Sequence, residues 1–199
     1  ERASADQAIQ QARQLITQQP DNRILVQQTV SLLLERARLG GQLEDFAQAS
    51  DLLADTVRRS GPHASLCPAR ARIDFSLHRL RAANAALAEC ASLMEPLEAG
   101  ALAGDIAFYS GDYRRAETLY RDLLNQGGHT GQYIRLALFR AKTGAPAEAA
   151  ALFEAAEKRY HGGAPPTIAW LRLQRGELAW QRGRLDEALA LYRLASDAM

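Results

Sequence analysis

The stretch that decides the fold is Gly104-Asp-Ile-Ala-Phe-Tyr-Ser-Gly111-Asp-Tyr113-Arg-Arg-Ala116-Glu-Thr-Leu-Tyr120. Residues 136–153 and 176–192 align with it. All three share a glycine, an alanine five residues later and an aromatic residue four residues after that: Gly111, Ala116 and Tyr120; Gly144, Ala149 and Phe153; Gly183, Ala188 and Tyr192. The glycine ends one helix and turns the chain, the alanine lets the next helix approach closely, and the aromatic ring fills the space between neighbouring hairpins. The pattern predicts repeated helix hairpins.

This pattern resembles the tetratricopeptide repeat (TPR), a helix-turn-helix unit with a period of about 34 residues. The step from Gly111 to Gly144 fits that period, whereas the step from Gly144 to Gly183 exceeds it because residues 161–166 lengthen one connection. The resemblance implies an all-α fold, a right-handed superhelical solenoid of antiparallel helix hairpins with about 11 helices.

Weaker copies of the repeat extend towards the N-terminus. Residues 78–87 keep an alanine at Ala83 but have His78 where the family prefers glycine, and Gly41 is followed by Phe46 where alanine is usual. We predict a single TPR solenoid over residues 1–199, in which residues 1–20 are the second helix of a truncated repeat and the hairpins occupy 23–60, 65–92, 96–126, 130–160 and 166–198. Because solenoids generally need polar caps at their ends, we expect the chain to be a piece of a longer array or to have its ends covered by another subunit. The alternative is a complete small domain with a modest cap.

Composition agrees with a folded helical protein. The 199 residues are 47% hydrophobic, which is enough for a sizeable core, and valine and isoleucine are too scarce to favour strands. The formal net charge is +1, so nucleic acid and anionic membrane surfaces are poor candidates for a partner. No apolar run approaches the roughly 18 residues that would cross a bilayer, so we expect no membrane insertion by this segment.

The sequence shows no constellation typical of catalysis. It contains no glycine-rich phosphate loop, no His-Glu-x-x-His and no pair of Cys-x-x-Cys clusters. His63, His78, His129 and His161 lie near predicted turns, separated by whole helices, so we expect no metal site. We therefore predict a protein without catalytic residues, metal or cofactor.

Cys67 and Cys90 are the residues that bear most on the compartment of the protein. They lie at similar distances from the turn near His78, on two helices that we expect to be antiparallel. A disulfide needs Cα atoms within about 7 Å, which this register permits. A disulfide would indicate an oxidising compartment such as the periplasm or the cell envelope. The alternative is two small buried side chains in a protein that could equally be cytoplasmic.

In proteins of the family that this chain resembles, ligands bind the concave surface formed by the first helix of each hairpin. Trp and Tyr on such a surface are residue types that anchor interfaces, although each could also serve ordinary packing between hairpins. Selecting the residues that point away from the second helix predicts a partner-binding face of Arg72, Phe75, Asp105, Phe108, Tyr109, Ile134, Leu138, Lys142, Trp170, Leu173, Glu177 and Trp180.

The resemblance implies a scaffold that binds a protein or peptide. The Lys and Asn residues with which some family members hold chaperone tails are absent, since Asp105, Leu138 and Glu177 stand where Asn is expected. We favour a part in a bacterial envelope assembly for exopolysaccharide export or secretion. The alternative is a structural spacer that self-associates through uncapped solenoid ends.

Overall fold

The computed structural model describes residues 2–40, 42–61, 63, 65–162 and 165–198. This part of the chain forms eleven α-helices and one short 3-10 helix, and it contains no strand. The predicted all-α architecture of helix hairpins is therefore confirmed for the residues described. Gly41, Gly163 and Ala164, which belong to predicted turns, lie outside them.

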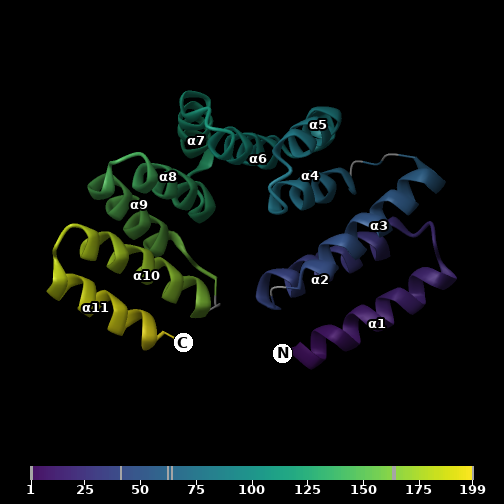
Figure 1. Cartoon of the computed structure of the whole chain (residues 1–199), viewed down its shortest axis with the longest axis horizontal. Helices are drawn as coiled ribbons and strands as arrows, with labels where there is room; N and C mark the ends of the chain where they lie inside the picture. The colour runs from purple at the N-terminus through teal and green to yellow at the C-terminus, as the bar shows by residue number, and fades with distance from the viewer. Residues whose placement is uncertain (1, 41, 62, 64, 163–164, 199) are drawn as a thin grey trace. The chain divides into compact units, whose positions relative to one another are not determined.

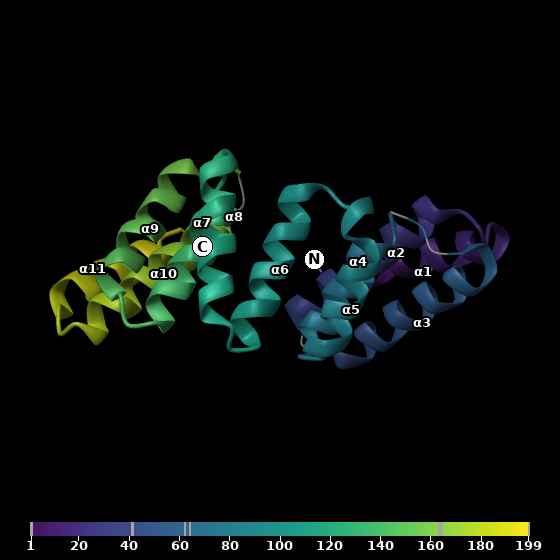
Figure 2. The ribbon, with the colours of Figure 1, turned by 90° about the horizontal axis from the view of Figure 1, so that it is seen from above.

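The chain divides into two compact units, Glu1–Ile106 and Ala107–Met199. Within the units, Figures 1 and 2 show successive helices folded back on one another, as in the pairs α2 with α3, α4 with α5, α8 with α9 and α10 with α11. The helices are α1 (Arg2–Gln18), α2 (Arg23–Gly40), α3 (Leu43–Ser60), α4 (Cys67–Ser76), α5 (Leu80–Cys90), η1 (Ala91–Leu93), α6 (Pro96–Tyr109), α7 (Tyr113–Gly127), α8 (Thr130–Lys142), α9 (Pro146–Arg159), α10 (Pro165–Gln181) and α11 (Leu185–Ser196). That all residues form one uninterrupted solenoid stays a prediction.

The turns inside the hairpins explain the repeated glycine. Gly111, Gly144 and Gly183 have φ angles of 84°, 87° and 72°, in the left-handed region where a Cβ is unfavourable. His78 occupies the equivalent turn between α4 and α5 with a φ of 54°. The left-handed turn conformation is therefore present even in the hairpin that has histidine in place of the glycine.

In the first unit, one hydrophobic cluster joins α1, α2, α3 and α4 around Val26, Leu33 and Leu53. Partly buried ion pairs link α1, α2 and α3. Arg36 donates to both carboxylate oxygens of Asp45, at 2.8 and 2.7 Å, and to Asp6 at 2.5 Å. The bonds to Asp45 and then Asp6 raise the pKa of Arg36, so the guanidinium stays charged.

In the second unit, the repeated alanines Ala116, Ala149 and Ala188 are all buried, as close helix packing requires. The repeated aromatics differ. Tyr120 and Phe153 are almost wholly buried, whereas Tyr192 packs at the edge of its cluster and is half-buried. The aromatic residue therefore fills the interior in two of the three repeats.

Candidate functional site

The sequence predicted a binding face on the first helices, and α10 carries its most exposed part. Trp170, Leu173, Glu177 and Trp180 recur at intervals of three and four residues, which places them along one face of the helix. Their exposures increase along it, since Trp170 is 36%, Leu173 47% and Trp180 56% exposed. Large apolar side chains thus remain uncovered on α10.

Contacts within the unit hold two of these side chains in place. The Trp170 ring packs edge-on against Phe153 of α9, with centroids 5.9 Å apart. Glu177 accepts hydrogen bonds from Gln181 Nε2 at 3.1 Å and from the Tyr192 hydroxyl at 3.4 Å. Burial of the phenol, and then the charge of Glu177, raise the pKa of Tyr192. These contacts therefore hold Trp170 and Glu177 of the α10 face in defined orientations.

On α8, the predicted face residues Ile134 and Leu138 pack against the hydrophobic cluster around Phe153, and Lys142 is exposed. At the end of α6, Tyr109 is exposed, whereas Phe108 is half-buried. The Phe108 ring lies 5.6 Å from Phe139. Most of the apolar side chains predicted for the binding face on these two helices therefore pack within the unit. Packing between hairpins was the alternative to partner binding.

In the first unit the predicted face residues are Arg72, Phe75 and Asp105. Arg72 is exposed and forms an ion pair with Glu98 of α6 at 2.7 Å. Phe75 packs against the cluster formed by α4, α5 and α6, and Asp105 is half-buried. Here the predicted face offers more charge than apolar surface.

Cys67 and Cys90 are joined in a disulfide, with their Cα atoms 5.7 Å apart. The bond connects the start of α4 to the end of α5, and Cys90 is buried in the cluster beneath. Both hairpin helices are short, so the covalent link fixes their register.

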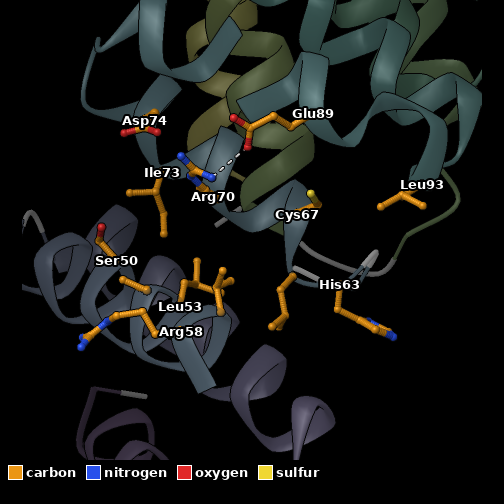
Figure 3. A pocket seen from close by; sticks show the side chains of 13 residues that line it. Ser50, Leu53, Arg58, His63, Cys67, Arg70, Ile73, Asp74, Glu89 and Leu93 are labelled. Atoms are coloured by element: carbon orange, nitrogen blue, oxygen red, sulfur yellow. Dashed lines mark hydrogen bonds and ion pairs between the residues drawn. The ribbon is translucent and has the colours of Figure 1, made fainter. Parts of the chain in front are cut away.

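Sequence reasoning did not find a second surface, a pocket of about 650 Å³ in the first unit. Figure 3 shows that its walls come from α3, from the α3–α4 connection, and from α4, α5 and η1. Leu53, Leu66 and Ile73 line it with buried side chains, and Arg58 and Glu89 are among its charged residues. The available signal was the spacing of Ser50, Leu53, Ala54, Val57 and Arg58, which is that of a packing stripe on a helix.

The described residues contain no group of three or more His, Cys, Asp or Glu side chains arranged to hold a metal ion. None of the helices described is long and apolar enough to cross a membrane.

No protein-family model matches the sequence. No curated protein matches it either. Among solved structures, a tetratricopeptide repeat protein from Parabacteroides merdae superposes with a TM-score of 0.80 at 15% identity, over 98% of this chain and 73% of that one. A thermophilic TPR protein from Thermus thermophilus gives 0.65 at 19% identity, over 83% and 91%. YrrB, described as a TPR protein with an unusual peptide-binding site, gives 0.53 at 13% identity, over 94% and 92%. These likenesses confirm the predicted TPR-type helical repeat fold.

Proposed function

We propose that this chain, a helical array of TPR type, is a non-enzymatic module that binds a protein or peptide partner on the faces of its first helices. The exposed stripe of Trp170, Leu173 and Trp180 on α10 carries the proposal. Tryptophan is enriched among the residues that dominate binding energy, because its large ring removes much apolar surface from water at little cost in side-chain entropy.

The surroundings of the stripe suit a partner with both apolar and charged groups. Glu177 lies between the apolar side chains, and Lys142 and Tyr109 are exposed on other first helices of the unit. Charges beside an apolar anchor select the partner and its orientation more than they add affinity. YrrB, whose fold is similar, is described by its peptide-binding site, which makes a peptide a reasonable ligand class for this chain.

Two glutamates with lowered pKa values have a structural explanation. Glu117 has its pKa lowered first by Arg140, and Glu154 first by Lys158. Both ion pairs are 2.7 Å long: Glu154 and Lys158 are four residues apart on the exposed face of α9, and Glu117 of α7 reaches the largely buried Arg140 of α8. Such pairs stabilise helices and need no reactive function.

A finer proposal is that the partner belongs to an envelope assembly for exopolysaccharide export or secretion. The Cys67–Cys90 disulfide supports an oxidising compartment, because structural disulfides are rare where glutathione and thioredoxin keep thiols reduced. On this ground we propose a periplasmic or envelope-associated location. A cytoplasmic location is the alternative.

A second candidate function is a spacer that self-associates. The observation in its favour is the exposure of Leu185 and Leu189, which lie one turn apart on α11. Exposed apolar side chains at such spacing can pack against another helix.

The test compares three variants in a pull-down from the source cells with quantitative mass spectrometry. We expect Trp180→Ala and Leu173→Ala each to reduce recovery of at least one captured protein by about tenfold or more, as the loss of an interface anchor does. Leu185→Ala is the matched control, because it removes an exposed apolar side chain from α11. It should leave that recovery unchanged.

Unchanged recovery of every captured protein with Trp180→Ala would count against the α10 face. Sedimentation velocity then distinguishes the second candidate. Self-association that Leu185→Ala with Leu189→Ala abolishes, and that Trp180→Ala leaves intact, would favour the spacer.

A further inference from the structure

The pocket in the first unit contains none of the residues predicted for the partner-binding face. Its volume of about 650 Å³ lies within the range of about 300–1,000 Å³ that is usual for ligand sites. It lies where α3 faces α4, α5 and η1, and Cys67 of the disulfide forms part of its wall. The inference drawn from it does not depend on the function proposed for α10.

The floor of the pocket is apolar and built on helices. Leu53 of α3, Leu66 and Ile73 are buried there, while Leu93 of η1 lines the rim and is 50% exposed. A leucine half uncovered beside an apolar floor has room for further apolar contact. The pocket thus extends the hydrophobic core of the unit to the surface.

The shape of the pocket follows its helices. On α3 the lining residues run from Ser50 to Arg58 at the spacing of a packing face. At 1.5 Å per residue this stripe is about 12 Å long, close to two helical turns. Backbone groups of the lining helices are bonded within those helices, so they offer no edge to an extended strand.

Charges border the apolar floor on both sides. Figure 3 shows the charged side chains Asp74, Arg70 and Glu89 on the α4 and α5 side of the pocket, and Arg58 on the α3 side. Arg70 lies beside Glu89, with which it forms an ion pair of 3.1 Å.

Two of the existing ion pairs of these residues are exposed, whereas the Asp74 side chain is only 16% exposed and lies 3.9 Å from Arg79. Glu89 and its partner Arg70 are both largely accessible to solvent, as is Arg58, which pairs with Asp55. Exposed pairs of this kind are weak, so the charged groups of a ligand can compete with them.

We propose that this pocket docks a short amphipathic helix of a partner protein. The docked helix presents apolar residues at i, i+3, i+4 and i+7 to Leu53, Leu66 and Ile73. Basic residues along one edge of its apolar stripe face Asp74 and Glu89, and acidic residues along the other edge face Arg58. The apolar floor supplies affinity, and the opposed charges set the direction in which the helix lies.

The probe is a fluorescein-labelled amphipathic peptide of about 15 residues, a length at which an isolated helix is marginally stable. A second peptide has the same composition and apolar stripe, with its acidic and basic edges exchanged. We expect the first to bind at least about tenfold more tightly in an anisotropy titration, because the second places like charges opposite each other.

Ala54→Trp tests the location of binding. Ala54 lines the pocket with an exposed side chain, so a tryptophan there occupies the groove without disturbing the buried floor. We expect it to weaken binding of the first peptide by about tenfold or more. The control is Ala151→Trp, the same change at an exposed alanine of α9. That variant and Trp180→Ala should bind the peptide as the wild type does, which separates this proposal from the one for α10.

Several outcomes would overturn the proposal. Absence of binding by the first peptide, or equal affinity for the two peptides, excludes a helix oriented by these charges. Equal binding by Ala54→Trp and the wild type excludes this pocket. A dimer in sedimentation velocity that Ala54→Trp dissociates identifies a second copy as the occupant instead. Anilinonaphthalene sulfonate fluorescence that Ala54→Trp abolishes and the peptide cannot displace identifies a small amphiphile.

Discussion

Gly176 shows how closely α10 and α11 approach each other. It is buried in the middle of α10. A Cβ atom at this position would lie 2.5 Å from Cε1 of Tyr192, well inside van der Waals contact. The sequence pattern assigned close approach to the alanines of the second helices, and the structure shows that a glycine of a first helix has the same role.

We expect Gly176→Ala to destabilise the protein. Alanine favours a helix over glycine by up to about 1 kcal/mol, but overpacking a filled interior costs typically about 1–3 kcal/mol, so a net loss of about 1–2 kcal/mol should result. Urea denaturation followed by circular dichroism measures it.

Gly131→Ala on α8 is the matched control. There the nearest atom to a new Cβ is Nη1 of Arg135 at 3.4 Å, the far end of a flexible side chain. The control should be neutral or slightly stabilising. A Gly176→Ala variant as stable as this one would contradict the close approach.

At the scale of elements, ion pairs link successive helices of the second unit. Arg140 of α8 reaches Glu117 of α7 at 2.7 Å and Glu148 of α9 at 3.1 Å. Although partial burial acts to lower it, these two carboxylates raise the pKa of Arg140. One guanidinium therefore connects three successive helices.

The α4–α5 hairpin relies on its disulfide. Its helices have 10 and 11 residues, and isolated helices shorter than about 12–15 residues are marginal in water. Cross-linking residues 23 apart is worth roughly 3 kcal/mol through the entropy of the unfolded chain. We expect a Cys67→Ala, Cys90→Ala double variant to lose about that much unfolding free energy in urea.

A reductant should destabilise the wild type by a similar amount and leave the double variant unchanged. Thiol labelling of denatured, unreduced protein gives a direct readout. Free thiols in that sample would show that the two cysteines are not bonded and would weaken the envelope proposal.

At the scale of the whole molecule, carboxylates couple stability to pH. The pKa values of Glu117 and Glu154 are lowered from the ordinary 4.5, the first chiefly by Arg140 and the second chiefly by Lys158. Because the folded values are the lower ones, the stabilisation is fully present above pH 4.5 and is lost as the pH falls below it.

We expect the melting temperature to change little down to about pH 5.5. It should fall once the pH is about one unit lower than that. Melting curves at a series of pH values measure this. Glu117→Gln removes one titrating group and should make the acidic fall shallower. Arg140→Met should act in the same direction, because it returns the pKa of Glu117 towards its ordinary value. A fall as steep as in the wild type would show that Glu117 does not contribute.

The sequence alone determined that this protein is all-helical and built from hairpins of TPR type. The reason is that the turns, the close approaches and the helix periodicity are local properties, which Gly111, Ala116 and Tyr120 express within one short stretch. Resemblance to a repeat then supplied the order of the helices.

Only the tertiary structure decided which apolar side chains stay uncovered. Ile134 and Leu173 have the same predicted place on a first helix, yet Ile134 packs into a cluster and Leu173 remains exposed. For the pocket of the first unit the sequence showed only a packing stripe on α3, since α3, α5 and η1 meet there across residues far apart in the chain. Which side chains stay exposed, and where pockets form, depends on how neighbouring hairpins fill the space between them. That packing involves residues that are far apart in the sequence.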